Sequence, residues 1–272
     1  MRNSIACGVF AALTAAGFCE ARSLPSLENS IQLRVISGRP VVDGVFLNGQ
    51  GPYRFLLDTG ARRNMVETRI AHKLGLTPTF RTDVITVAGA IQAVGGMVDN
   101  VSLGSVTAFG QEFLFMSMDV AHLVSSGIQG VLGQKFLTNF DYLLDFANHR
   151  LIFGGPAPDG GSRVSIESIE ERPAIQTSEG MLVLDSGTDI AILFRTSSLA
   201  WASDGAIHTA SGSASVSTFE GKDLRIAGRL YRTRRTAFVA KGDLYEDGEL
   251  PASLFRAVFV SNSGKFAILD AR

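Results

Sequence analysis

The sequence predicts a mainly β fold of two similar lobes, produced by an internal duplication. Three observations support this fold class. An apolar run leads into an acidic triplet twice, first at Asp58-Thr59-Gly60 and again at Asp185-Ser186-Gly187. The chain has 29 glycines and many short runs of Val, Ile, Phe and Leu, which is typical of strands joined by turns. Finally, the order of predicted elements repeats around a Gly- and Pro-rich segment, with a period far longer than a solenoid repeat.

The repeat divides the chain into two lobes and a linker. We expect an N-terminal lobe over 30–155, a linker over 156–163 and a C-terminal lobe over 164–272. Composition predicts the linker, which belongs to a run of Gly, Pro, Asp and Ser. With 46% hydrophobic residues, a chain of 272 residues can fill a core in one or two lobes.

The first 21 residues resemble a secretory signal peptide. A short positive start precedes an apolar run over 5–18, which is too short to span a membrane comfortably, and small residues end at Ala21. We expect export to the periplasm or the medium, with a mature chain that begins near Arg22; the mass of the recovered protein tests this. Both cysteines, Cys7 and Cys19, lie in the leader, so the mature chain would have no disulfide. A lipid anchor through Cys19 and a buried N-terminal helix are the alternatives.

In the first lobe the pattern predicts strands punctuated by turns. The strands are expected over 31–46 (as two strands), 53–57, 84–115, 142–146 and 150–153. Asn48-Gly49 is a hairpin turn signal between the second and third of them. A helix is expected over 66–74, because apolar residues recur there at helical spacing and Gly75 provides a stop. A second short helix is expected over 134–140.

Beyond the linker the same order of elements recurs. Strands are expected into Asp185, between 206 and 239, and in a closing hairpin over 257–260 and 266–269, and an apolar stretch over 190–194 follows Asp185. A short helix over 252–256 occupies the place of the helix over 134–140. The match in order, rather than any single element, predicts the duplication.

The two triplets bring one aspartate each to the end of a buried run. Apolar runs are buried and Asp seldom is, so Asp58 and Asp185 are candidate catalytic residues. Two carboxylates held close together cannot both ionise cheaply, so they share a proton. The ionised member can then take a proton from water while the protonated member donates to a substrate carbonyl. This chemistry hydrolyses an amide without a metal or a cofactor. The alternative is a pair of turn-capping aspartates in an inactive fold.

The neighbours of these aspartates suit the same task. Thr59 and Ser186 supply hydroxyl groups that can hydrogen-bond across the lobe interface. Gly60 and Gly187 permit tight turns and let backbone N–H groups approach the carboxylates. Thr188 is placed to hydrogen-bond to the second carboxylate or to the attacking water.

Together these motifs resemble a known family. Asp58-Thr59-Gly60-Ala61 and Asp185-Ser186-Gly187-Thr188 resemble the active-site signatures of the pepsin and retropepsin class of aspartic proteases. Gly130-Val131-Leu132-Gly133 resembles the element that crosses behind the catalytic loop in that class. The resemblance covers almost the whole mature chain and implies a compact bacterial relative, with two retropepsin-like halves fused in one monomeric endopeptidase. Its partner would be a peptide or protein substrate in an extended conformation.

Two other functions remain open on the same fold. One is a non-catalytic peptide-binding protein, and the other is a protease that processes a single partner protein. Some positions depart from the family pattern and bear on activity. In Gly248-Glu249-Leu250-Pro251, Glu249 stands where the class prefers an apolar residue and Pro251 where Gly is usual. Arg62-Arg63 follows the first triplet, where pepsins usually carry small hydroxyl residues.

Two Gly-rich segments are candidate flap tips, that is, hairpin ends that would contact the substrate. The residues concerned are Ala88, Gly89 and Ala90 in the first lobe and Ser211 and Gly212 in the second. Neither segment carries the Tyr of pepsin flaps. Ordinary hairpin turns are the alternative interpretation.

Charge and composition argue against several other functions. With 25 basic and 26 acidic residues, nothing points to nucleic acid or to an anionic membrane surface. The four histidines have neither metal-ligand spacing nor cysteine companions, so no metal site is expected. The basic stripe at Arg225, Arg229, Arg232, Arg234 and Arg235 is interpreted as a solvated strand face, with an anionic partner as the alternative. No Gly-Lys-Ser/Thr sequence follows either triplet, which argues against a phosphate-binding loop.

Overall fold

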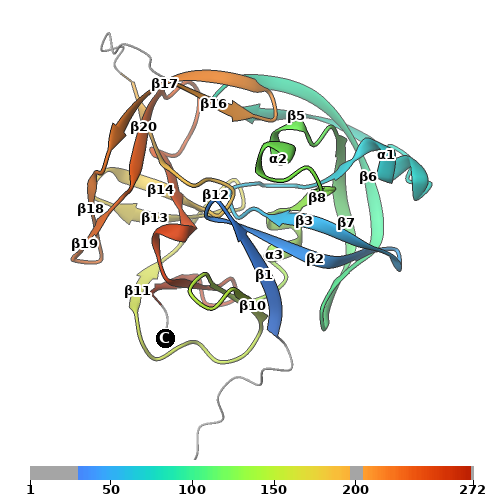
Figure 1. Ribbon diagram of the computed structural model, residues 1–272, viewed down its shortest axis with the longest axis horizontal. Coiled ribbons are helices and arrows are strands. Elements are labelled where there is room, and N and C mark those ends of the chain that lie inside the picture. The colour runs from blue at the N-terminus through green and yellow to red at the C-terminus, as the bar shows by residue number, and fades with distance from the viewer. Residues whose placement is uncertain (1–29, 197–204, 271–272) are drawn as a thin grey trace, which may run out of the picture.

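The computed structural model describes residues 30–196 and 205–270, which form a mainly β fold with three short α-helices (Figure 1). The predicted leader, its cleavage site and both cysteines lie outside the described residues. None of the described helices has the length and apolarity needed to cross a membrane. The predicted fold class is therefore confirmed.

Within the part of the chain that the structure describes, the first half contributes ten strands. They are β1 (Ser30–Ile36), β2 (Arg39–Leu47), β3 (Gln50–Leu57), β4 (Asn64–Glu67), β5 (Phe80–Thr86), β6 (Gly89–Leu103), β7 (Val106–Met116), β8 (Gly130–Leu132), β9 (Tyr142–Asp145) and β10 (Arg150–Phe153). Of these, β2, β3, β6, β7 and β8 lie on the right of Figure 1. The helices are α1 (Thr68–Lys73), α2 (Asp119–Val124) and α3 (Gln134–Leu137).

The described residues of the second half form thirteen strands and one short 3₁₀ helix. The strands are β11 (Ser162–Ser165), β12 (Glu167–Ile169), β13 (Arg172–Thr177), β14 (Gly180–Asp185), β15 (Ala191–Arg195), β16 (Gly205–Thr209), β17 (Gly212–Glu220), β18 (Asp223–Ile226), β19 (Arg229–Arg232), β20 (Arg235–Ala240), β21 (Gly248–Pro251), β22 (Ala257–Ser261) and β23 (Phe266–Leu269). The 3₁₀ helix η2 (Ala252–Leu254) lies where a helix over 252–256 was expected.

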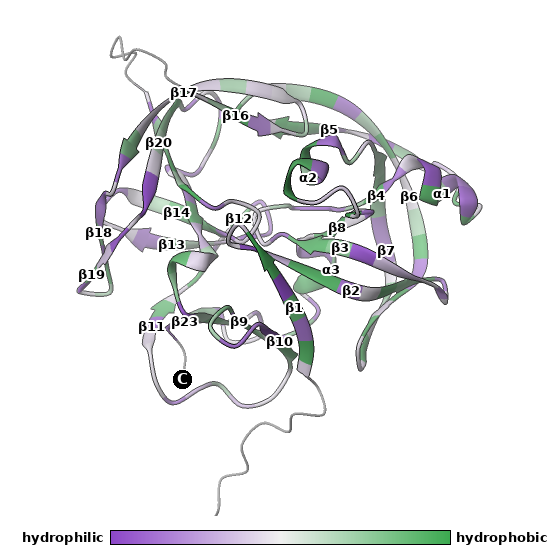
Figure 2. Ribbon diagram, in the orientation of Figure 1, coloured by the Kyte–Doolittle hydropathy of each residue, from purple (hydrophilic) through white to green (hydrophobic). Residues whose placement is uncertain are grey.

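The two halves share one strand order, as the duplication requires. The first half runs β1-β2-β3-β8-β4-β7-β6-β5, and the second runs β12-β13-β14-β21-β15-β20-β17-β16. The parallel pairs also correspond, because β3–β8 and β4–β7 match β14–β21 and β15–β20. The central strands are hydrophobic, while β18 in the β18–β19 hairpin alternates exposed hydrophilic residues with buried Leu224 and Ile226 (Figure 2). Each half is therefore built around the same buried strands, and those strands carry the acidic triplets.

A sheet at the base joins the two halves. Its strands run β11-β23-β22-β9-β10-β1, so β9 from the first half pairs with β22 from the second. Leu144 and Leu151 pack with Val258 and Leu269 in one continuous core. The predicted linker 156–163 connects β10 to β11. Its last two residues belong to β11, which pairs with β23 at the edge of this sheet.

Several element boundaries differ from the sequence prediction for reasons of tertiary pairing. The helix expected over 66–74 starts at Thr68. Residues Asn64–Glu67 instead form the strand β4, which pairs with β7 on one side and β8 on the other. The helix expected over 134–140 ends at Leu137. Helix α2 was not predicted. These short elements are decided by long-range contacts that outweigh local propensity.

Candidate active site

Asp58 and Asp185 lie together at the floor of a cleft between the two halves. Asp58 directly follows β3, and Asp185 is the last residue of β14. Their side chains are in hydrogen-bonding contact. A Cβ atom added to Gly60 would lie 2.4 Å from the Asp185 Cγ, and one added to Gly187 would lie 2.5 Å from the Asp58 Cγ. Each carboxyl group thus packs over the glycine of the opposite triplet, where no larger side chain fits.

Backbone amides hold each carboxylate in place. The N–H groups of Gly60 and Ala61 both donate to Asp58 Oδ1 at 2.9 Å. The N–H of Gly187 donates to Asp185 Oδ1 at 2.6 Å. These bonds orient the two side chains and favour their ionised forms. The geometry is the one that the two glycines were expected to permit.

Thr59 and Ser186 form a reciprocal hydrogen-bond lattice across the interface, which we call the hydroxyl lattice. The Thr59 hydroxyl accepts from the Ser186 N–H at 2.9 Å and donates to the Leu184 carbonyl at 2.6 Å. The Ser186 hydroxyl accepts from the Thr59 N–H at 3.0 Å and donates to the Leu57 carbonyl at 2.8 Å. Both side chains are fully buried. The lattice ties the ends of β3 and β14 together directly beneath the two carboxylates.

The proton affinities of the two aspartates differ. Burial raises the pKa of Asp58 well above its usual value, and the negative charge of Asp185 raises it further. Burial also raises the pKa of Asp185, but the Gly187 N–H and the hydrogen bond with Asp58 oppose the rise. The pair therefore holds a proton preferentially on Asp58 while Asp185 is the first to ionise.

A crossing element supports each aspartate from behind. In the first half β8 runs parallel to β3, and the Asp58 N–H donates to the Leu132 carbonyl at 3.0 Å. In the second half β21 runs parallel to β14 and places Pro251 opposite Asp185. Gly133 donates its N–H to Asn64 Oδ1 at 3.0 Å, whereas proline has no N–H that needs a partner. The second crossing element therefore forms despite its unusual sequence.

The cleft above the aspartates has a volume of about 1580 Å³ and is lined by both halves. Leu56, Met65 and Val131 contribute to its first-half wall. Arg172, Glu246 and Glu249 contribute to its second-half wall. Arg62 and Asp83 also line the first-half wall, and Ile192 and Leu244 also line the second-half wall, so each wall contains both apolar and charged residues.

Residues 42–136 match the aspartyl protease family. The match includes the first triplet and the crossing element β8, and it supports an aspartyl protease family for this chain. The fold is similar to the crystal structure of an aspartic proteinase from Irpex lacteus, with a TM-score of 0.54 and 13% sequence identity. The alignment covers 89% of this chain and 96% of that one, so the pepsin-like two-lobed fold is shared over nearly the full length. No curated protein matches the chain.

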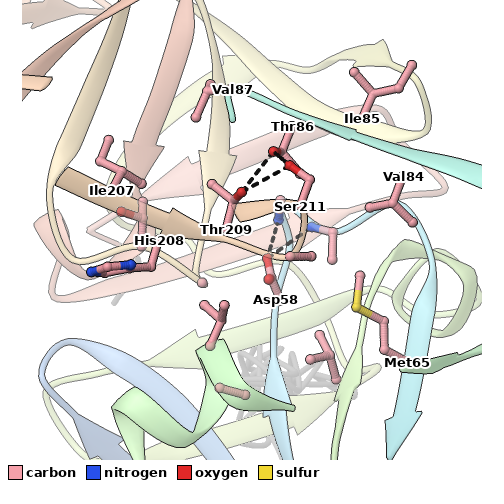
Figure 3. Close-up of a pocket in the computed structure, with 18 of the residues that line it drawn as sticks. Asp58, Met65, Val84, Ile85, Thr86, Val87, Ile207, His208, Thr209 and Ser211 are labelled. Atoms are coloured by element: carbon pink, nitrogen blue, oxygen red, sulfur yellow. Dashed lines mark hydrogen bonds between the residues drawn. The ribbon is translucent and has the colours of Figure 1, made fainter. Parts of the chain in front are cut away.

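The hairpin tips of the two lobes of this aspartyl protease fold meet above Asp58 (Figure 3). The Thr86 hydroxyl lies 2.9 Å from that of Thr209 and also contacts that of Ser211. We call these three side chains the tip cluster. Thr86 also accepts from the Ala88 N–H at 3.1 Å, which fixes its side chain in the turn. Nothing in the sequence around Thr86 or Thr209 indicated this contact, because the two residues are 123 positions apart.

Of the two predicted hairpin tips, only that of the second lobe lines the cleft with the residues that were predicted. Ser211 and Gly212 line the cleft, as expected for residues that contact a substrate. At the tip of the first-lobe hairpin, Thr86 and Val87 line the cleft. Ala88, Gly89 and Ala90 are not among the lining residues; Gly89 and Ala90 are the first residues of β6 and pair with the end of β5. The substrate contact predicted for this tip therefore moves by a few residues toward the end of β5.

We expect Thr86→Val to increase opening of the cleft, because the change removes the hydroxyl that joins the two tips. A hydrogen bond contributes about 0.5–1.5 kcal/mol, so amide hydrogen exchange at 86–89 and 209–212 should accelerate roughly 2- to 10-fold. Thr82→Val is the matched control on the same strand, since the Thr82 hydroxyl reaches only its neighbour Asp83. Equal exchange in both variants would show that the tip cluster does not hold the cleft closed.

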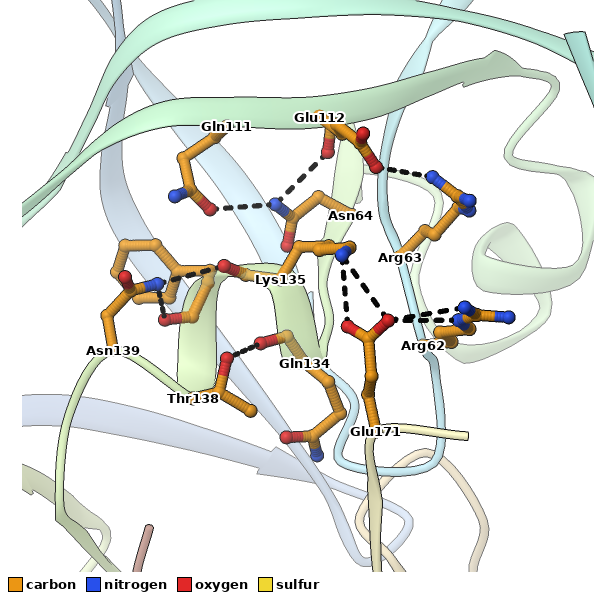
Figure 4. Close-up of polar contacts among 11 residues, drawn as sticks. Arg62, Arg63, Asn64, Gln111, Glu112, Gln134, Lys135, Thr138, Asn139 and Glu171 are labelled. Atoms are coloured by element: carbon orange, nitrogen blue, oxygen red, sulfur yellow. Dashed lines mark hydrogen bonds and ion pairs between the residues drawn. The ribbon is translucent and has the colours of Figure 1, made fainter. Parts of the chain in front are cut away.

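Ion pairs across the interface hold the loops that follow the triplets (Figure 4). Glu171, in the β12–β13 turn, pairs with Arg62 at 3.3 Å and with Lys135 at 3.0 Å. Arg39, at the start of β2, pairs with Asp189 at 2.6 Å and donates to the Gly187 carbonyl at 2.8 Å. Arg62 and Asp189 hold equivalent places, four residues after each aspartate. The first loop thus carries the cation of its ion pair and the second carries the anion.

The unusual Arg62-Arg63 sequence is explained by these contacts. Arg62 pairs with Glu171 of the other half. Arg63 pairs with Glu112 on β7, and its guanidinium lies 5.5 Å from the centre of the Phe80 ring. Both arginines therefore have carboxylate partners other than Asp58 and Asp185.

Of the two partners predicted for Thr188, the structure tests only Asp185. The Thr188 hydroxyl donates to the Ile190 carbonyl at 3.1 Å, within its own loop, rather than to Asp185. It therefore shapes the second triplet's loop at the edge of the cleft. Across the described part of the chain, no group of three or more His, Cys, Asp or Glu side chains has the arrangement of a metal site.

Proposed function

We propose that this chain is an aspartic endopeptidase, exported as a monomer, that hydrolyses peptide bonds with a water activated by Asp58 and Asp185. The observation that carries the proposal is the pair of carboxyl groups in contact at the cleft floor, each oriented by backbone N–H groups. The aspartyl protease family match supports it. Export is predicted from the leader alone.

The chemistry follows from the unequal proton affinities. Ionised Asp185 takes a proton from a water molecule, and the oxygen of that water attacks the carbonyl carbon of the scissile bond. Asp58, protonated, gives its proton to the carbonyl oxygen, so no full oxyanion develops. The tetrahedral diol then collapses as Asp185 returns its proton to the leaving nitrogen, the C–N bond breaks, and Asp58 recovers a proton from the diol. Protons balance over one cycle, and the pair is ready for another substrate.

The cleft is suited to a peptide in an extended conformation. The β5–β6 hairpin and the corresponding hairpin tip of the second lobe border the cleft. The backbone of the β5–β6 hairpin can pair with a substrate strand. The tip cluster closes over the aspartates and would limit access of bulk water. A substrate must separate the tips to enter, so its binding is coupled to the opening described above.

A peptide library incubated with the protein from acidic to neutral pH tests the proposal. We expect internal cleavage, read by mass spectrometry, and binding of a peptide whose scissile amide is replaced by a tetrahedral carbinol. The carbinol peptide should bind at least about a hundredfold more tightly than its parent, since it resembles the transition state. Equal affinity for the two peptides without any cleavage would instead identify a non-catalytic peptide-binding protein.

A further inference from the structure

Glu249 lies beside the catalytic pair, at a position where the first lobe has an apolar residue. On β21, Glu249 lies opposite Val183 of β14, two residues before the Pro251–Asp185 pair. On β8, Val131 lies opposite Leu56 of β3 in the same register. Both Val131 and Glu249 line the cleft. The duplication thus places one apolar and one acidic residue at equivalent points on either side of the aspartates.

The environments of these two residues differ accordingly. Val131 packs with Leu56, Met65 and other apolar side chains in the wall of the first lobe. The backbone of Glu249 pairs with β14 and β15, but its carboxyl group makes no hydrogen bond or ion pair with any residue in 30–196 or 205–270. Burial raises the pKa of Glu249 well above its usual value, and the charge of Asp185 raises it further. A partly buried carboxyl group without a partner is unfavourable in the free protein.

A second carboxyl group on the same wall also lacks a full set of partners. Glu246 is 1% exposed and lines the cleft. Its Oε1 accepts from Arg172 Nη1 at 2.8 Å, whereas its buried Oε2 has no partner. Arg172 also pairs with Glu170 at 3.4 Å. Arg172 therefore lies near three glutamates, Glu170, Glu246 and Glu249, and pairs directly with only two of them.

Each wall of the cleft would contact one of the two substrate residues that flank the scissile bond. Successive side chains of an extended peptide point in opposite directions. The pseudo-two-fold relation of the lobes, centred on the aspartate pair, directs one of these side chains to the first-lobe wall and the other to the second-lobe wall. The subsite of the second lobe is thus the one that contains Glu249.

We propose that this second-lobe subsite selects a cationic side chain, Lys or Arg, with Glu249 as its anionic partner. The subsite around Val131 takes an apolar side chain. The inference rests on the proposed function, because it assigns the substrate class of the same cleft. A cation at this point gives the Glu249 carboxyl group the partner that it lacks in the free protein and favours its ionised form.

The test compares peptides that differ by one charge. At each of the two positions flanking the scissile bond, Lys is exchanged for norleucine, which has a similar length without the ammonium group. At one of the two positions we expect kcat/KM to favour Lys by roughly 10- to 100-fold, the range of a buried charge-assisted hydrogen bond. Glu249→Gln should reduce that preference to near unity. Glu249→Val, which copies Val131, should reverse it in favour of norleucine.

Two controls separate the subsite from general effects. Glu167→Gln removes one negative charge from an exposed site on β12 of the same lobe and should leave the preference unchanged. Thermal melts of every variant show that the fold is retained. The same peptide pairs are also measured for binding to Asp58→Asn, whose affinity can be read without turnover.

The outcomes distinguish the subsite from the proposed function. Cleavage without a Lys preference, or a preference that survives in Glu249→Gln, overturns the cationic subsite and leaves the protease proposal standing. Charge-dependent binding that Glu249→Gln abolishes, with no cleavage by the wild-type protein, supports the subsite and overturns the protease. A protein that neither binds nor cleaves either peptide series overturns both.

Discussion

Replacing Asp58 by Asn is expected to lower the rate of peptide cleavage by at least about a hundredfold, and replacing Asp185 by Asn should do the same. Asparagine keeps the shape of the side chain but cannot accept or give the proton that the reaction moves. In Asp185→Asn the base is missing, and in Asp58→Asn the acid is missing. The measurement is kcat/KM on a peptide cleaved by the wild-type protein. Asp99→Asn, an exposed carboxylate on β6, is the matched control and should cleave normally.

The same variants should change how stability depends on pH. Burial raises the pKa of both aspartates, so the folded protein binds more protons than the unfolded chain above the usual Asp value. Their contribution to stability is therefore greatest at acidic pH and is lost as pH rises through the folded-state pKa values. Asp58→Asn removes the larger part of this loss of stability at higher pH, so the melting temperature of the variant should exceed that of the wild type near neutral pH.

Near-wild-type cleavage by either Asn variant would refute the two-carboxylate mechanism.

The fold and the centre of the site follow from local sequence patterns that occur twice. An apolar run that ends in Asp, a hydroxyl residue and Gly is conspicuous at Asp58 and again at Asp185, and the order of strands around each copy is the same. The hydroxyl lattice could also be anticipated, because Thr59 and Ser186 hold the same place in each copy. Duplication thus makes long-range geometry visible in one sequence.

The rest of the site is built from single-copy contacts between distant residues. Arg62 and Glu171 are 109 positions apart and meet only because the lobes are packed together. Neither residue has a counterpart of the same charge in the other lobe, so no repeat marks the pair. From the sequence, Arg62 therefore looked like a departure from the family pattern rather than half of an ion pair. The Thr86–Thr209 contact was hidden in the same way, since Thr is common in exposed strands.

Ser186→Ala is expected to destabilise the protein by about 2–6 kcal/mol, because it leaves two buried backbone groups without partners at about 1–3 kcal/mol each. Those groups are the Thr59 N–H and the Leu57 carbonyl. Thr59→Val should have a similar cost through the Ser186 N–H and the Leu184 carbonyl. Such a loss is a large fraction of the total stability of an ordinary domain. Urea unfolding of each variant measures it.

Conservative variants isolate the hydroxyl lattice from other causes. Thr59→Ser keeps the hydroxyl and removes one methyl group, so it should cost only about 1 kcal/mol. Ser102→Ala removes a hydroxyl that pairs with Thr107 on the exposed β6–β7 hairpin and should stay within about 0.5 kcal/mol of the wild type. If Ser186→Ala were no more destabilising than Ser102→Ala, the lattice would contribute nothing to folding. If it destabilises as expected, the bonds that set the distance between the two catalytic carboxyl groups are also those that hold the lobes together, so stability and catalytic geometry cannot be varied independently here.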